Sequence, residues 1–175
     1  LRVAIITAEG RESFCTGNDL KYMAAGGRIW FPSSGFGGLT NRTGRTKPVI
    51  AAVNGAALGG GLEIALACDI IVASENAVFG LTEVKVGLVA MMGGIQRLSR
   101  QIGSKLANEM LLTGLPIDAS RALGAGLINY VTEQHVLMER ALDIARQIAE
   151  ASPMAVHCTM DIAARSGRFA SVDEA

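Results

Sequence analysis

The segment from Pro48 to Cys68 most strongly limits the folds open to this chain. It begins with an apolar, β-branched run over Pro48–Val53, which predicts a buried strand, and Asn54-Gly55 then predicts a turn. A run of three glycines leads into Leu62-Glu-Ile-Ala-Leu-Ala-Cys68, a short helical pattern that is apolar nearly all round. A helix of that kind is stable only when protein surrounds it. We therefore expect other elements on every side of this helix.

Strand and helix patterns alternate in the first half of the chain, and helical patterns dominate the second half. Strands are expected over residues 2–7, 48–53, 69–73, 77–80 and 126–131. Helices are expected from Asp19 onward and over residues 62–68, 94–102, 105–113 (capped by Ser104), 119–124 (capped by Asp118), 136–150 and 153–165. Residues 26–45 predict a surface loop, since they are rich in glycine and contain Pro32. This order favours an α/β fold with stacked strands and a helical C-terminal segment.

The helical pattern over 136–150 defines an expected apolar stripe. Its members are Val136, Met138, Ala141, Leu142, Ala145 and Ile148. Because the C-terminal helices carry apolar stripes and the early elements are short, we expect the chain to associate with further copies of itself.

Composition excludes several classes of protein. The 175 residues include 16 Lys and Arg and 16 Asp and Glu, and this neutral balance argues against nucleic acid as the main partner. No apolar run reaches the roughly 20 residues of a membrane span, and the first residues lack the order of a secretory leader. The widely spaced Cys15, Cys68 and Cys158 predict free thiols of a reducing cytoplasm. Neither a disulfide frame nor a metal site is expected, because His135 and His157 also lie far from every glycine cluster.

The glycine run before the buried helix is the first candidate for a functional site. Glycines at a helix start leave backbone N–H groups unblocked at the positive end of the helix dipole. Such groups suit a phosphate, a carboxylate or the enolate oxygen of a thioester. The alternative is that the glycines only let the helix pack closely against a strand. Gly17 predicts a second exposed donor in the N–H of Asn18, or an ordinary turn with Asn18 or Asp19 as the N-cap.

Two glutamates are the candidate acid–base groups. Glu63 lies in the first turn of the expected buried helix among apolar neighbours, and Glu83 follows an apolar strand. A single Glu is more often a surface residue than a catalyst. A pair beside an anion site, however, suits water addition to a double bond conjugated to a carbonyl. One carboxylate then takes a proton from water and the other supplies a proton to carbon.

Weaker candidates have little support. The segment 38–46 has glycine spacing unlike a phosphate loop and carries Arg where such a loop has Lys, and no Gly-x-Ser-x-Gly elbow occurs. Cys68 belongs to the apolar helix, which predicts an inert core thiol.

Several motifs then occur in a fixed order along almost the whole chain. They are Phe14-Cys-Thr-Gly-Asn-Asp-Leu20, Lys47-Pro-Val-Ile-Ala-Ala-Val-Asn-Gly55, Leu58-Gly-Gly-Gly-Leu-Glu63, Cys68-Asp-Ile-Ile-Val-Ala73, Phe79-Gly-Leu-Thr-Glu83, Gly93-Gly-Ile-Gln-Arg-Leu98, Asn108-Glu-Met-Leu-Leu-Thr-Gly114 and Ala122-Leu-Gly-Ala-Gly-Leu127. Together they resemble the enoyl-CoA hydratase/isomerase (crotonase) family. Members of that family are longer at both ends, so the resemblance covers their central portion. The runs over 1–7 and 35–40 are more particularly similar to carnitinyl-CoA dehydratases.

The resemblance implies roles for individual residues. The N–H groups of Asn18 and Gly60 would form an oxyanion hole for an acyl-CoA thioester, and Glu63 and Glu83 match the two glutamates of the hydratases. The CoA moiety would lie along Asn18, Asp19, Leu20 and Lys21, with Gly60. It implies a spiral of ββα turns over residues 1–131, a helical segment over 132–175, and assembly as trimers or dimers of trimers. No metal and no redox cofactor are implied, because CoA is part of the substrate.

The segment after Gly87 departs from the family pattern. The family has a proline and small residues there, whereas this chain has Leu88-Val-Ala-Met-Met-Gly93. Met91 and Met92 are bulky and flexible, and we expect them just past Glu83, where they would narrow the acyl pocket. The leading hypothesis is reversible hydration of a 2-enoyl-CoA. Its alternatives are isomerisation with one glutamate and a non-catalytic acyl-CoA-binding role.

Overall fold

The computed structural model describes residues 1–28 and 30–166. Residue 29 of the expected surface loop and residues 167–175 of the expected C-terminal segment lie outside the described part. The described strands are β1 (Ala4–Ile6), β2 (Ser13–Cys15), β3 (Val49–Val53), β4 (Ala56–Leu58), β5 (Ile70–Ser74), β6 (Val78–Gly80), β7 (Ile117–Asp118) and β8 (Tyr130–Thr132). The helices are α1 (Leu20–Ala24), α2 (Gly60–Ala67), α3 (Gly94–Gln101), α4 (Ser104–Thr113), α5 (Ala119–Gly124), α6 (Leu137–Glu150) and α7 (Pro153–Ser166), with short 3-10 helices η1 (Phe36–Gly38), η2 (Glu83–Val86) and η3 (Gln134–Val136).

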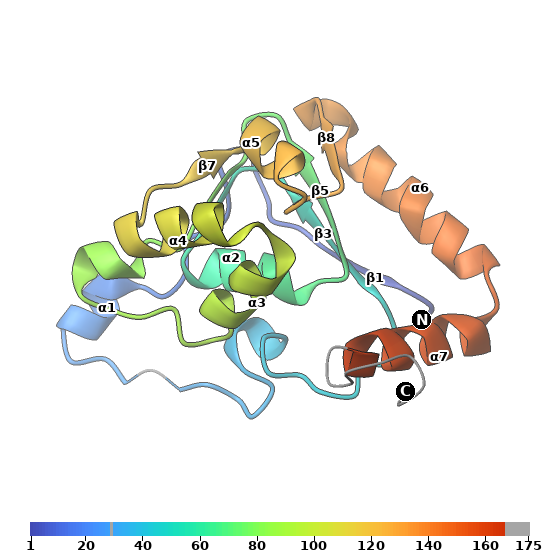
Figure 1. Cartoon of the computed structure of the whole chain (residues 1–175), viewed down its shortest axis with the longest axis horizontal. Helices are drawn as coiled ribbons and strands as arrows, with labels where there is room; N and C mark the ends of the chain where they lie inside the picture. Colours follow the sequence, from blue (N-terminus) through green and yellow to red (C-terminus); the bar gives the residue numbers. More distant parts are fainter. Residues whose placement is uncertain (29, 167–175) are drawn as a thin grey trace.

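Successive strands alternate between two sheets. One sheet has the order β1-β3-β5-β8 and is parallel throughout, and the other has the order β2-β4-β6-β7, with only β7 antiparallel to its neighbour within the described residues. Parallel neighbours require a crossover, and here each crossover contains a strand of the other sheet and a helical segment (Figure 1). The chain therefore winds in ββα turns, which confirms the expected α/β fold.

β3 shows why its sequence is apolar without alternation. Ile50 and Ala52 belong to a cluster with α6 on one face of the sheet. Ala51 and Val53 belong to the main core around α2 on the other face. A parallel strand that is buried on both faces has no solvent side on which polar residues would be favourable.

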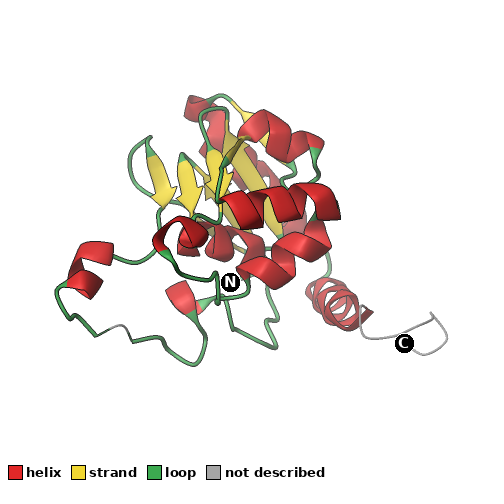
Figure 2. Cartoon of the chain, turned by 60° about the vertical axis from the view of Figure 1, so that its left-hand side comes forward, coloured by secondary structure: helices red, strands yellow, loops and turns green. Residues whose placement is uncertain are grey.

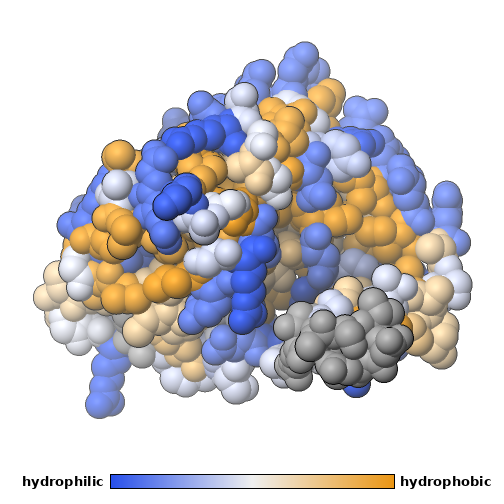
Figure 3. Space-filling view, viewed as in Figure 1, coloured by the Kyte–Doolittle hydropathy of each residue, from blue (hydrophilic) through white to orange (hydrophobic). Residues whose placement is uncertain are grey.

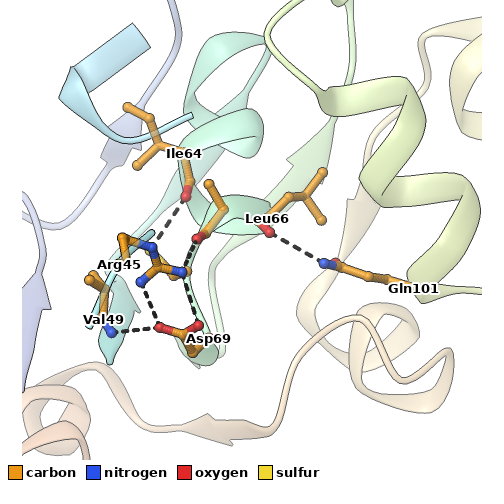
Figure 4. Close-up of polar contacts among 8 residues, drawn as sticks. Arg45, Val49, Ile64, Leu66, Asp69 and Gln101 are labelled. Atoms are coloured by element: carbon orange, nitrogen blue, oxygen red, sulfur yellow. Dashed lines mark hydrogen bonds and ion pairs between the residues drawn. The ribbon is translucent and has the colours of Figure 1, made fainter. Parts of the chain in front are cut away.

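α2 lies at the centre of the main core, as its sequence predicts. Every residue from Gly61 to Ala67 is buried, and the helix packs against β2, β4 and α3. Its C-terminal carbonyls are bonded by side chains from elsewhere in the chain (Figure 4). Arg45 donates to the carbonyl of Ala67 at 3.1 Å and Gln101 donates to that of Leu66 at 3.2 Å. Two further bonds, of 2.7 and 2.9 Å, join Arg45 to Asp69.

Some expected elements differ from the structure. β2, β4 and β7 were not predicted, because each contains at most one β-branched or aromatic residue, whereas the equally short β1, β6 and β8 contain two or more. The expected cap at Ser104 is wrong: Ser104 is the first residue of α4, and Gly103 is the N-cap without a side-chain hydrogen bond. The cap at Asp118 is confirmed, since its side chain accepts the N–H of Arg121 at 2.7 Å. The expected surface loop is also partly wrong, because Leu39 and Thr40 within it are buried.

The C-terminal helices contrast with each other. α6 packs on β1, β3 and β5, but its buried residues are Leu137, Ala141, Ile144 and Ala145, whereas Met138 and Leu142 of the expected stripe are exposed. α7 has no buried residue and runs apart from the sheets (Figure 2). The division into residues 1–131 and 132–175 stays a prediction. No helix in the described ranges has both the length and the apolar character needed to cross a membrane.

Candidate active site

A pocket of about 210 Å³ opens beside the N-terminus of α2. Of the residues that the sequence singled out, Asn18, Leu20, Gly60, Glu63 and Glu83 all line it. They come from the segment before α1, from α1 itself, from α2 and from η2, so the fold brings distant motifs to one space. A second hollow of about 250 Å³ lies beside α7 and contains none of these residues.

Asp19 and Lys21 do not line the pocket. Asp19 is the N-cap of α1, because its carboxylate accepts the N–H groups of Lys21 at 2.9 Å and Tyr22 at 3.0 Å. The turn interpretation of this motif is therefore correct for Asp19. Contact of Asp19 and Lys21 with CoA stays a prediction.

The three glycines at the start of α2, the N-cap Gly59 and the helical Gly60 and Gly61, are favoured for different structural reasons. A Cβ atom at Gly61 would collide with the carbonyl oxygen of Cys15, so this glycine allows close packing. Gly59 has φ +54° and ψ −127°, a conformation that favours glycine, and a Cβ atom there would lie 3.3 Å from Oε1 of Glu83. A Cβ atom at Gly60 would lie 2.6 Å from the ring of Phe36. Close packing and an open helix end therefore occur together.

Two backbone amides lie near each other at this helix end. Gly17 has φ +91°, and a Cβ atom on it would stand 3.2 Å from the nitrogen of Gly60. Within the described part of the chain, neither the N–H of Asn18 nor that of Gly60 donates to a protein acceptor. Both amides are therefore available to a ligand, and the dipole of α2 favours negative charge at this place.

Glu63 is held firmly. It is only 3% exposed, and its Oε1 accepts the N–H groups of Met92 at 2.7 Å and Gly94 at 2.9 Å. A Cβ atom at Gly94 would lie 2.9 Å from the same oxygen, so a glycine is needed for this approach. Burial raises the pKa of Glu63, and the charge of Glu83 raises it further, while the two N–H groups and Arg97 act in the opposite direction.

Glu83 has a different environment at the start of η2. Its Oε2 is buried and has no hydrogen-bond partner among the described residues. Burial raises the pKa of Glu83, against a smaller lowering effect of its own backbone N–H. The site therefore combines one carboxyl group with two amide donors and one without such donors on its buried oxygen.

The turn that carries Met91 and Met92 was only partly anticipated. Both methionines line the pocket, as expected. Met91 is 75% exposed and lies at the mouth of the pocket, whereas the backbone N–H of Met92 donates to Glu63. This backbone role of Met92 was not predicted from the sequence. The Gly93-Gly94 pair was the available signal, because tight turns at a helix start need such residues.

Other candidate groups have no evident part in this site. Cys68 is buried, and burial raises the pKa of its thiol to about 12, so the thiolate does not form near neutral pH. No group of three or more His, Cys, Asp or Glu residues that could hold a metal ion is found among residues 1–28 and 30–166.

Comparison with known sequences gives one family. The model of the family described as enoyl-CoA hydratase/isomerase matches residues 1–172. The carnitinyl-CoA dehydratase of Citrobacter koseri is 46% identical over 164 residues, which are 93% of this chain and 63% of that protein. The carnitinyl-CoA dehydratase of Salmonella arizonae is 43% identical over 99% of this chain and 67% of its own length. The chain thus spans 63% of the length of the first of these relatives.

Solved structures agree with the sequences. A carnitinyl-CoA hydratase from Mycobacterium avium has a TM-score of 0.86 and 45% identity, covering 91% of this chain and 62% of that one. An enoyl-CoA hydratase from Mycobacterium tuberculosis H37Rv has a TM-score of 0.90 and 44% identity, covering 99% of this chain and 67% of that one.

Proposed function

The chain belongs to the enoyl-CoA hydratase/isomerase family, and we propose that it catalyses the reversible addition of water to a 2-enoyl-CoA thioester. One observation carries the proposal. The pocket of about 210 Å³ places two unbonded amides at a helix N-terminus beside two carboxyl groups in unlike environments. Such a set can stabilise an enolate and move two protons.

The amides of Asn18 and Gly60 are the proposed oxyanion hole. The thioester carbonyl oxygen would accept both N–H groups, and its negative charge would grow as water attacks the conjugated double bond. Because the positive end of the α2 dipole lies at the same place, the enolate is favoured more than the ground state. The CoA moiety would leave the pocket past Leu20, with Asp19 and Lys21 at its side.

The proposed acid–base roles follow from the surroundings of each carboxyl group. Glu63 would act as the base, because two N–H groups on Oε1 favour its carboxylate form and leave Oε2 for water. Glu83 would act as the acid, because burial favours its protonated form. Water then gives its oxygen to the β-carbon and a proton to Glu63, while Glu83 protonates the α-carbon. Exchange with solvent restores both groups.

The reaction requires no redox cofactor, because hydration changes no net oxidation state, and CoA enters as part of the substrate. The mouth of the pocket is apolar, with Leu88, Val89 and Met91 along it. This lining supports an uncharged acyl chain as the substrate.

A carnitine-type acyl group is the second candidate, because the relatives are named carnitinyl-CoA dehydratases. The rings of Phe31 and Phe36 both line the pocket, with centroids 6.2 Å apart. Aromatic faces attract quaternary ammonium groups.

The test is an assay of the purified protein with crotonyl-CoA, following loss of the enoyl absorbance, beside its 4-trimethylammonio analogue. Hydration of either thioester supports the proposal, and the ratio of kcat/KM assigns the acyl group. Conversion of a 3-enoyl-CoA without any hydration would identify an isomerase. Binding of both thioesters without turnover would identify a non-catalytic acyl-CoA-binding protein, and either result would contradict hydration.

We also propose that the protein assembles as a homotrimer or a dimer of trimers. Apolar side chains gather over the side of the molecule that carries α4 and the segment after β6 (Figure 3), where Val84, Leu112 and Leu115 are exposed outside the pocket. Exposed apolar patches of this kind mark protein contacts. Sedimentation that shows a stable monomer at micromolar concentration would contradict assembly. The proposed cytoplasmic location rests on the free thiols of Cys15, Cys68 and Cys158.

A further inference from the structure

Glu63 depends on a turn that is distant in sequence. The two N–H groups on its Oε1 belong to Met92 and Gly94, so the position of the carboxylate follows the position of this turn. The turn follows an exposed segment and ends at Gly94, the first residue of α3. Backbone donors hold a carboxylate in place only when the backbone itself is fixed. Something must therefore fix residues 92–94.

Arg97, one turn into α3, makes the contacts that do so. Its Nη1 donates to the carbonyl oxygen of Met92 at 3.2 Å, and its Nη2 donates to the carbonyl oxygen of Thr40 at 2.7 Å. Thr40 is buried, and its hydroxyl accepts the N–H of Phe36 at 2.8 Å. One guanidinium thus joins the turn under Glu63 to the loop that supplies a wall of the pocket.

The residue before α3 leaves room for this guanidinium. Gly93 has φ +93°, and a Cβ atom on it would collide with Nη1 of Arg97. A side chain at this position would displace the guanidinium from its place against the turn, and the positive φ itself favours glycine.

The charge of Arg97 acts in the same direction as its hydrogen bonds. The charged groups that act on Glu63 are Glu83 from η2 and Arg97 from α3. Glu83 favours the protonated form of Glu63 and Arg97 favours the carboxylate. Around Arg97 itself lie Arg45 and the Cys68 thiol.

We propose that Arg97 is a positioning residue for the base of the reaction: it fixes the Met92–Gly94 turn and keeps Glu63 as an oriented carboxylate. This inference rests on the proposed function, because a base is needed only if water is activated. Arg97 acts through Glu63, and its expected effect is on kcat at low pH rather than on binding of the thioester.

The test compares Arg97→Gln, which loses the charge, with Arg97→Lys, which keeps it. For Arg97→Gln we expect the acidic limb of the kcat–pH profile to move to higher pH, by up to about one pH unit, because a charge that favours the Glu63 carboxylate is lost. At pH values well below the acidic limbs of both proteins, this shift lowers kcat by up to about tenfold, and KM should change less than about twofold. Arg97→Lys should retain the acidic limb of the parent. Arg100→Gln is the matched control, since Arg100 is exposed on the same helix and should leave the profile unchanged.

Two results would overturn the inference. One is an equal loss of kcat in Arg97→Gln at every pH, which a merely structural role predicts. The other is an acidic limb in Arg97→Lys that moves as far as in Arg97→Gln. Thermal unfolding of each variant ensures that the profiles refer to folded protein.

A second measurement separates this inference from the proposed function. The carboxyl carbon of Glu63 is titrated by NMR in ¹³C-labelled parent and Arg97→Gln proteins, with its signal assigned by Glu63→Gln. A higher midpoint in Arg97→Gln supports the inference even if the parent hydrates no thioester, in which case only the proposed function fails. Equal midpoints in an active parent and its variant overturn the inference alone.

Discussion

The two ends of α2 differ in whether the rest of the chain satisfies their backbone hydrogen-bonding groups. At the C-terminal end, Arg45 and Gln101 bond the carbonyls of Ala67 and Leu66, and Asp69 holds Arg45 in place. At the N-terminal end, Gly59 offers no side-chain cap and the amide of Gly60 has no acceptor among the described residues.

This difference separates stability from function along a single helix. Unsatisfied carbonyls in a core are costly, so distant side chains bond them. Unsatisfied N–H groups are costly too, but here they line a pocket that a ligand can fill. Changes at the N-terminal end should therefore lower activity, and changes at the C-terminal end should lower stability.

The largest expected effect concerns the two carboxyl groups near the N-terminal end. Glu63→Gln and Glu83→Gln should each lower kcat for crotonyl-CoA by roughly 10²–10⁴-fold, the usual contribution of a general acid or base. The double variant should be little worse than either single one, because groups that act as a unit are not additive. Steady-state kinetics of the three variants measure this, with thioester binding followed in parallel. A Glu83→Gln protein as active as the parent would exclude the two-glutamate mechanism.

A smaller effect is expected for the amide donor. Gly60→Val should lower kcat on the order of 10²-fold, the scale of losing one oxyanion donor. The new Cβ would lie 2.6 Å from the Phe36 ring, so either the ring or the start of α2 must move. Gly124→Val is the control, because a Cβ atom at Gly124 meets nothing within 4 Å. If folded Gly60→Val keeps near-normal turnover, the oxyanion assignment is wrong.

At the C-terminal end of α2 we expect the opposite result, a loss of stability without a loss of activity. Arg45→Met should leave the carbonyl of Ala67 without its side-chain donor and the Asp69 carboxylate with only the N–H of Val49, which costs roughly 1–2 kcal/mol and lowers Tm by about 2–8 °C. The kcat of the folded protein should stay close to that of the parent. Thermal unfolding and kinetics test both parts, with Arg42→Met, exposed on the same loop, as the control. A large loss of kcat at unchanged Tm would contradict the inference that this end of α2 contributes to stability and not to activity.

The smallest effect is a gain in stability at the functional end. Burial raises the pKa of Glu83, so the folded protein binds this proton more tightly than the unfolded chain does. The parent therefore loses stability as the pH rises from the ordinary pKa of Glu through the raised value. Glu83→Gln should remove this loss and raise Tm at neutral pH by roughly 2–4 °C, about 1 kcal/mol for a domain of this size. Unfolding at about pH 4 and about pH 8 checks the sign. A Tm difference between variant and parent that is equal at both values would show that Glu83 costs nothing in its charged form.

Sequence patterns anticipated the long or strongly apolar elements. The run Pro48–Val53 predicted β3, and the all-round apolar pattern over 62–68 predicted α2. β2 and β4 were not predicted, because neither contains more than one β-branched or aromatic residue and each depends on pairing with a strand from another turn of the spiral. The buried stripe of α6 differs from the expected one. The sheet on which the helix packs buries Leu137 and leaves Met138 exposed.

The candidate site divides in the same way. The glycine run, Asn18 and the two glutamates were identified from the residues and from the resemblance, since a motif specifies backbone freedom and chemical type. The sequence by itself therefore determined which segments are buried, which backbone amides are left open and which side chains can transfer protons. Only the tertiary structure decided that Met92 and Gly94 bind Glu63, that Arg97 fixes their turn, and that Glu83 has an oxygen without a partner. The physical reason is that a hydrogen bond or a desolvated charge depends on which distant segments the winding of the chain brings together.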